Sequence, residues 1–151
     1  MGAIMEFATE KQIESFLSTC RIEGQKNFLM AFKKKTWLKS FIDFFIIGGS
    51  YYVQSSVKPK ILAFTPKGIY LMDISDITEN RSNQVVEMPW NQVKDFTYKT
   101  VLNTVRLNWH YQNENYIFSV DVGQVSQHVG QYQFNKDNYD YLAQQDFFQS
   151  K

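Results

Sequence analysis

The sequence predicts a mainly β domain, α+β by element count, in which seven antiparallel strands form a small curved barrel or sandwich and a helix covers its open end. Aromatic residues make up 17% of the 151 residues, and aromatic side chains favour strands. Six short apolar or alternating segments follow one another between residues 60 and 122, separated by turn residues. The length suits one domain that buries about two-thirds of its unfolded surface.

The chain begins with the clearest helix signal. Thr9 and Gln12 have the spacing of a capping box, and the following apolar residues recur at helical spacing, at Ile13, Phe16, Leu17 and Cys20. Cys20 lies on this stripe, so we interpret it as a small buried hydrophobe and not as a reactive thiol. We expect residues 1–25 to be a helical extension and 26–151 to be the main domain, in one compact unit.

A strand over "NFLMAFKKK" leads into residues 33–50, "KKKTWLKSFIDFFIIGGS". As a helix over 36–47, inserted between the first two strands, this segment has an apolar face of about 200°, which needs cover on more than one side. A strand is the alternative there, because aromatic and β-branched residues dominate. Lys39, Asp43 and Gly48-Gly49 exclude a membrane span. The candidate apolar interaction face consists of Phe41, Ile42, Phe45 and Ile46.

The remaining strands are predicted from residue 60 onwards. "KILAFTPKGIYLMDI" is a hairpin around Thr65-Pro66-Lys67-Gly68, with Ile69, Leu71 and Asp73 on one face of its second strand. "ISDITENRSN" is a polar connection, and Pro89 ends the short strand in "QVVEMPW" or places it at an edge. An antiparallel meander follows, formed by "VKDFTYKT", "TVRLNWHY" and "YIFSVDV".

A final helix is predicted over "NKDNYDYLAQQDFF". Asn135 is suitable as its N-cap, and apolar residues follow at helical spacing, at Tyr139, Leu142, Ala143 and Phe147.

This order of elements, with seven antiparallel strands before one amphipathic helix, resembles the pleckstrin-homology fold over roughly residues 26–148. Two units resemble bacterial pleckstrin-homology-like domains of the YokE-like kind: the T-x-x-G turn at 65–68 between apolar strands, and Met88-Pro89-Trp90-Asn91-Gln92-Val93. The resemblance implies a binding or scaffolding domain that in some members self-associates. The inserted helix departs from the short loop usual at that place.

Charge is distributed unevenly along the chain, although the net charge is only +1. Residues 1–75 sum to +4 and residues 76–151 to −3, because lysines bracket the insertion. In pleckstrin-homology domains that bind phosphoinositides, basic residues around this loop hold the lipid. One interpretation is a solvated lysine run that protects a sheet edge, and the other is contact with an anionic surface. The candidate contact residues are Lys33, Lys34, Lys35, Trp37, Lys39, Lys58 and Lys60.

Motifs for catalysis or for metal or cofactor binding are absent from the sequence. His110 and His128 have no Cys, Asp or Glu at metal-ligand spacing. Trp109, Tyr111 and Phe118 lie in the net acidic half, which favours core packing over nucleic-acid stacking. We therefore expect no enzyme activity, no cofactor, no nucleic acid and no small-molecule substrate.

The predicted function is a non-enzymatic binding or interaction module, of unknown ligand, that recognises a protein partner or a second copy of itself. The alternative is peripheral association with anionic lipid through the segment Lys33–Lys39. A single cysteine and the lack of a secretory signal at the N-terminus lead us to expect a cytoplasmic location, peripheral to the membrane in the alternative.

Overall fold

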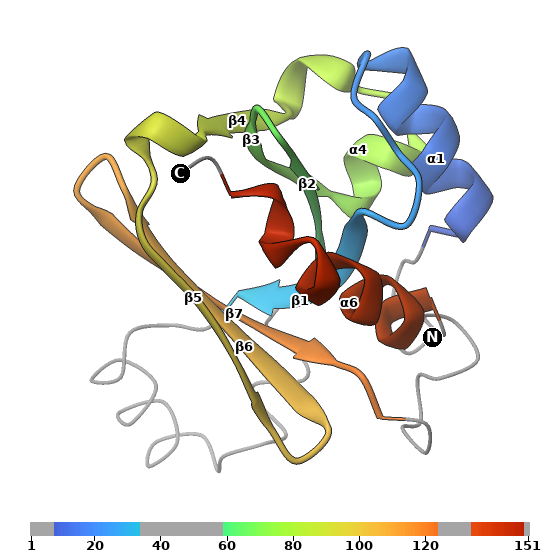
Figure 1. The fold of residues 1–151 in the computed structure, drawn as a ribbon. Helices are drawn as coiled ribbons and strands as arrows, with labels where there is room; N and C mark the ends of the chain where they lie inside the picture. Colours follow the sequence, from blue (N-terminus) through green and yellow to red (C-terminus); the bar gives the residue numbers. More distant parts are fainter. Residues whose placement is uncertain (1–7, 34–58, 124–133, 150–151) are drawn as a thin grey trace, which may run out of the picture.

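The computed structural model describes residues 8–33, 59–123 and 134–149. The predicted inserted helix over 36–47 lies outside these residues. Three α-helices, seven strands and three short 3₁₀ turns follow in chain order (Figure 1): α1 (Glu10–Thr19), β1 (Phe28–Lys33), β2 (Pro59–Thr65), β3 (Gly68–Asp73), α4 (Ile74–Thr78), η1 (Ser82–Gln84), β4 (Val86–Pro89), η2 (Trp90–Gln92), β5 (Lys94–Val101), β6 (Thr104–Tyr111), β7 (Glu114–Asp121), α6 (Phe134–Gln144) and η3 (Asp146–Phe148).

The seven strands form one antiparallel sheet in the order β4-β3-β2-β1-β7-β6-β5. This confirms the predicted number of strands, their antiparallel pairing and the hairpin at 65–68, where Thr65 pairs with Gly68. The sheet curves but does not close by hydrogen bonds, because its edge strands β4 and β5 do not pair with each other. The predicted barrel is therefore confirmed only as a curved, barrel-like sheet, which stays open between β4 and β5.

The inner face of the sheet carries the larger core. Alternate residues of most strands point into it, and Leu62, Leu107, Trp109 and Phe118 are fully buried there. Trp109 stacks on Tyr116 and Phe118, with ring centroids 5.5 and 5.4 Å apart. The alternation predicted for β6 is confirmed, and the predicted role of Trp109 and Phe118 in the core is confirmed with it.

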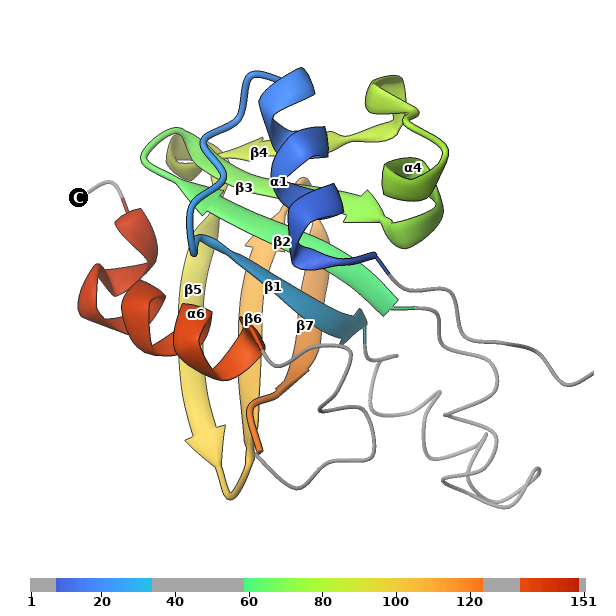
Figure 2. The same ribbon diagram turned by 90° about the vertical axis from the view of Figure 1, so that its right-hand side faces the viewer.

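A second core lies on the outer face of β1–β3, beneath α1 and α4 (Figure 2). The predicted capping box of α1 is present, since Thr9 Oγ1 accepts from the Gln12 amide and Gln12 Oε1 accepts from the Thr9 amide. Ile13, Phe16 and Leu17 are buried as predicted, and Cys20 packs at the edge of this core.

The predicted polar connection after β3 was wrong in part, because it begins with the short helix α4. Ile74 and Ile77 are buried against the outer core, and the carboxylate of the buried Asp76 accepts from the Asp73 amide at 3.1 Å. The five-residue segment is amphipathic, and its two isoleucines decide its position.

Helix α6 lies across the opening between β1 and β5 (Figures 1 and 2). The predicted N-cap role of Asn135 was wrong, because Asn135 lies inside the helix and is buried. Its amide group accepts from Met30 N at 2.9 Å and donates to Met30 O at 3.0 Å, while Asn138 donates to Phe28 O. β1 pairs with β7 only at Phe32 and Lys33, so the backbone of Phe28–Met30 has no strand partner on that side. The side chains of Asn135 and Asn138 form hydrogen bonds with this backbone instead.

The helical spacing of the sequence predicted that the last helix would continue to Phe147. Instead, α6 ends at Gln144, and the chain then enters the inner core through a sharp turn. Asp146, Phe147 and Phe148 have φ of 51°, 56° and 59°. Phe147 is nevertheless fully buried, with its ring centroid 4.9 Å from that of Phe64 and 4.5 Å from that of Tyr98. The strained turn therefore places an aromatic ring over the end of the barrel-like sheet.

Candidate functional site

The predicted cationic site is described only in part. Lys33 and Lys60 lie at the same end of the β1–β2 ladder, where Ala31 pairs with Lys60 and Phe32 with Pro59. The remaining candidates, both cationic and apolar, lie outside the described residues: Lys34, Lys35, Trp37, Lys39, Phe41, Ile42, Phe45, Ile46 and Lys58.

Lys33 is engaged by β7. Its Nζ lies 3.5 Å from Glu114 Oε1 and 4.8 Å from the centroid of the Tyr116 ring. The pKa of the Glu114 carboxyl is lowered, first by a hydrogen bond from Tyr116 and then by the charge of Lys33. Burial and Glu114 raise the pKa of Tyr116 to about 12. These contacts hold Lys33 against the end of the sheet.

Lys60 forms an ion pair with Asp73 on the neighbouring strand β3. The lysine side chain is 27% exposed and the aspartate 48%, so both remain accessible to water. Both described lysines of the predicted site therefore already have a carboxylate partner, which reduces the positive charge that they offer to a ligand.

Within the described residues, the one histidine lies at the surface, and Cys20 and Tyr70 line a hollow. His110 is exposed on the outer side of β6, and His128 lies outside the described residues. A surface hollow of about 450 Å³ is lined in part by Cys20, Tyr70 and Glu87. Burial raises the pKa of the Cys20 thiol and of the Tyr70 phenol, so both favour their neutral, weakly nucleophilic forms.

No three His, Cys, Asp or Glu side chains within residues 8–33, 59–123 and 134–149 lie close enough together to hold a metal ion. In the same ranges, no helix combines the length and the apolar character that crossing a bilayer requires.

Among the described elements, α1 and α4 cover the outer face of β1–β3, whereas no described helix covers the outer face of β5–β7 (Figure 1). The strand register places four cross-strand pairs of β5 and β6 on this face, ending at the hairpin turn: Lys94 with His110, Thr97 with Asn108, Lys99 with Arg106, and Val101 with Thr104. On β7, Asn115, Ile117, Ser119 and Asp121 continue these rows. The surface is polar, with two exposed cations opposite each other at Lys99 and Arg106.

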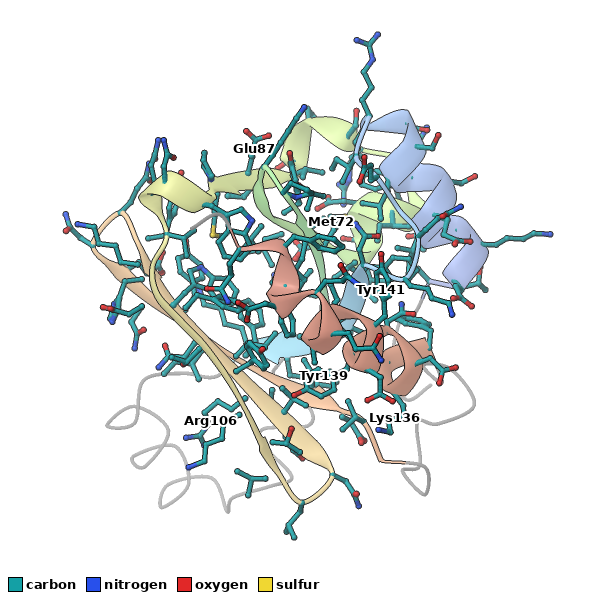
Figure 3. The ribbon with its side chains drawn as sticks, viewed as in Figure 1. Met72, Glu87, Arg106, Lys136, Tyr139 and Tyr141 are labelled. Carbon is teal, nitrogen blue, oxygen red and sulfur yellow. The ribbon has the colours of Figure 1, made fainter. Side chains whose placement is uncertain are left out.

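Arg106 and Tyr139 lie on opposite sides of the β5–β6 ribbon (Figure 3). On the Tyr139 side, α6 covers the strands, and Tyr139 Oη lies 3.1 Å from Thr100 Oγ1. On the Arg106 side, among the described residues, neither Lys99 nor Arg106 has a carboxylate within ion-pair distance. The helix therefore contacts one face of the hairpin, while Lys99 and Arg106 on the other face are exposed.

Sequence reasoning did not single out this outer face as a site. The alternation in "TVRLNWHY" places Arg106 on the other face of the strand from the apolar Leu107, and this could have indicated an exposed cation. The alternation does not reveal that Lys99 is the partner of Arg106, because pairing depends on register.

Comparison of this chain with protein-family models, with curated proteins and with solved structures finds no match.

Proposed function

We propose that this chain is a non-enzymatic interaction module with a pleckstrin-homology-like fold, which binds a protein partner through the outer face of β5–β7. The strand order β4-β3-β2-β1-β7-β6-β5 and the C-terminal helix across the sheet opening support the fold assignment. The YokE-like family remains part of this proposal, since it rests on the residue patterns at 65–68 and 88–93.

The observation that carries the proposal is the contrast between the two outer surfaces of one sheet. On β1–β3 the outer residues are apolar and α1 and α4 cover them. On β5–β7 the outer residues other than Val101 and Ile117 are polar or charged, and most of those on β5 and β6 are exposed. Paired strands held by an inner core form a rigid platform, and a rigid platform binds a partner at a low entropic cost.

Capture of partners from a lysate of the source cells tests this function. Thr97→Trp places a bulky neutral side chain in the middle of the outer face, where Thr97 is exposed and pairs with Asn108. We expect the wild type to retain partner proteins that Thr97→Trp loses. Ser15→Trp, at an exposed position of α1, controls for the stickiness of an added indole and should retain them.

Retention of the same proteins by all three forms would contradict the proposed surface. Sedimentation velocity over a range of concentrations separates the two kinds of partner. If the partner is a second copy of the chain, the isolated wild type should associate as its concentration rises. If the partner is a different protein, the isolated chain should remain monomeric.

A second candidate function is contact with anionic lipid through the segment Lys33–Lys39. It is favoured by the position of Lys60 near Lys33, the first residue of that segment, at one end of the β1–β2 ladder. The carboxylate partners of these two lysines weigh against it and place it second. Replacement of Lys33, Lys34 and Lys35 by Gln should release the protein from anionic vesicles at low salt if this segment binds them.

A further inference from the structure

The β5–β6 hairpin has an unusual turn. Val101 pairs with Thr104, so Leu102 and Asn103 form a two-residue turn. Leu102 has φ of 57° and is 93% exposed, and Val101 beside it is 55% exposed. Hairpin turns of this length require a positive φ at the first central residue and favour Gly or Asn there. Leu102 therefore combines a backbone cost with the exposure of a large apolar side chain.

The other hairpin turns of the described strands do not share this feature. The β6–β7 turn has Gln112 and Asn113 at φ of 50° and 65°, and the β2–β3 turn consists of Pro66 and Lys67. Gln112 shares the positive φ of Leu102, but neither of these turns exposes a large apolar side chain. The described residues include three exposed large hydrophobics, of which two are Val101 and Leu102 and the third is Val86.

A hydrogen bond and a close contact with the residues after β7 hold the turn in place. Asn103 O accepts a hydrogen bond from Val122 N at 2.9 Å, and Gly123 lies so close to Asn103 that a Cβ there would come within 2.8 Å of the asparagine Cβ. Figures 1 and 2 both show the hairpin extending beyond the other described strands and helices. The apolar tip is therefore presented on a braced support, and folding does not bury it.

Two cations lie behind the tip. Lys99 and Arg106 form a cross-strand pair, and like charges directly opposite each other destabilise a sheet. On β7, Asp121 pairs with Thr104, one pair nearer the turn than Arg106, and its carboxylate accepts from the Gly123 amide at 2.9 Å. Among the described residues, no carboxylate forms an ion pair with either member of this like-charge pair.

The spacing between the tip and the cations matches the edge of a lipid bilayer. Lys99 precedes Leu102 by three residues, which is about 7–10 Å along a strand. The polar zone of one leaflet is roughly 5–8 Å thick. A Leu102 side chain at the hydrocarbon boundary would therefore place Lys99 and Arg106 at the level of the phosphates, where cations are attracted to anionic lipids.

We propose that the tip of the β5–β6 hairpin, formed by Val101 and Leu102, inserts shallowly into an anionic membrane surface while Lys99 and Arg106 contact the lipid headgroups. This site differs from the segment Lys33–Lys39, and it goes beyond the protein-binding function proposed above. With the tip in the membrane, the Thr97–Asn108 and Lys94–His110 pairs lie farther along the strands and remain available to a protein partner.

Sedimentation with vesicles tests the proposal. We expect the wild type to bind vesicles of phosphatidylcholine with about one-third phosphatidylserine at low salt, and to bind phosphatidylcholine alone much less. Leu102→Asn should reduce the partition coefficient about tenfold, because the apolar side chain is lost. The same change should not lower the melting temperature, since Asn accepts a positive φ better than Leu. A loss of binding together with preserved stability would separate a binding role from a structural one.

Two further variants test the charges. Lys99→Gln and Arg106→Gln should each reduce binding to the anionic vesicles about fivefold and leave binding to neutral vesicles unchanged. Lys136→Gln removes one positive charge from exposed α6, and Val86→Thr removes an exposed apolar residue from β4. Both controls should bind like the wild type.

Three outcomes would overturn the proposal. The wild type could fail to sediment with anionic vesicles at low salt. Leu102→Asn could bind as well as the wild type, which would assign any lipid binding to another part of the chain. Leu102→Asn could instead lose a captured protein without any effect on vesicle binding, and the tip would then belong to a protein interface.

Discussion

The two halves of the sheet share one inner core but differ on their outer faces. On β1–β3, both faces are buried, and outer residues such as Ile61 and Met72 lie beneath α1 and α4. On β5–β7, the outer face is polar and ends in an exposed apolar hairpin turn. The change occurs where Phe32 pairs with Ser119, between β1 and β7. The first half therefore buries apolar residues on both faces of its strands, whereas the second half buries them mainly on its inner face.

The largest expected effect is on the free energy of unfolding when an outer isoleucine is replaced by alanine in each half of the sheet. Ile61→Ala on β2 should lower the free energy of unfolding by about 2–5 kcal/mol, because Ile61 is fully buried and a cavity remains. Ile117→Ala on β7 should cost less than about 1.5 kcal/mol, since Ile117 is only half-buried. Urea denaturation of both variants measures the difference. Equal losses would mean that the outer face of β7 is covered as fully as that of β2.

The next effect concerns the seam between the halves. Asn135→Ala should lower the free energy of unfolding by about 1–3 kcal/mol, because Met30 N and O lose their buried hydrogen-bond partner. Asn115→Ala, at an exposed position of β7, should change it by less than about 0.5 kcal/mol. Thermal denaturation of the two variants is sufficient. A harmless Asn135→Ala would mean that β1 does not need α6 to satisfy its open edge.

The third effect is a loss of stability at alkaline pH, which is caused by Tyr116 on the inner face of β7. The pKa of a tyrosine is about 10 in an unfolded chain, whereas that of Tyr116 is raised to about 12 in the folded protein. The folded state then retains a proton that the unfolded state has lost, so stability falls as the pH rises from 10 to 12. Tyr116→Phe should make this decline shallower by at most about 1 kcal/mol per pH unit. Urea denaturation between pH 8 and 12 tests it, and an unchanged slope would contradict the burial of Tyr116.

The smallest effect concerns the outer cations. Lys99→Thr should raise the free energy of unfolding by about 0.2–1 kcal/mol at low salt, because it removes a like charge opposite Arg106. Lys136→Thr should instead lower it by a few tenths of a kcal/mol, since it removes an ion pair with Asp140 at 3.0 Å. Both effects should shrink in high salt. A loss of stability in Lys99→Thr at low salt would indicate that a neighbouring carboxylate neutralises Lys99.

Much of the fold could be predicted from local patterns. The capping box at Thr9 and the alternation in β6 both specify side-chain directions over a few residues, and both predictions are confirmed. The helix α4 was missed because two isoleucines in a five-residue segment give too short a period to recognise. Asn135 was misassigned because an asparagine before an apolar stripe is typical of an N-cap, and the alternative partner lies on β1.

The candidate site could be predicted less well. The lysine cluster was visible as a run in the sequence, but the carboxylates that engage Lys33 and Lys60 come from β7 and β3. Leu102 was not recognised at all, because "TVLNTV" lacks the Asn-Gly or Asp-Gly signal of a tight hairpin turn. Its unusual backbone became apparent only when the pairing of Val101 with Thr104 fixed the turn at two residues.

The sequence by itself determined where the strands run and which of their residues point the same way, because side chains alternate along a strand whatever it pairs with. Only the tertiary structure decided which outer face is covered, which cations stand opposite each other and which strand edge a helix completes. These features depend on contacts between distant parts of the chain, such as the hydrogen bond between Met30 and Asn135, 105 positions apart. Local periodicity carries no information about such contacts, because their free energy arises only when the elements pack together.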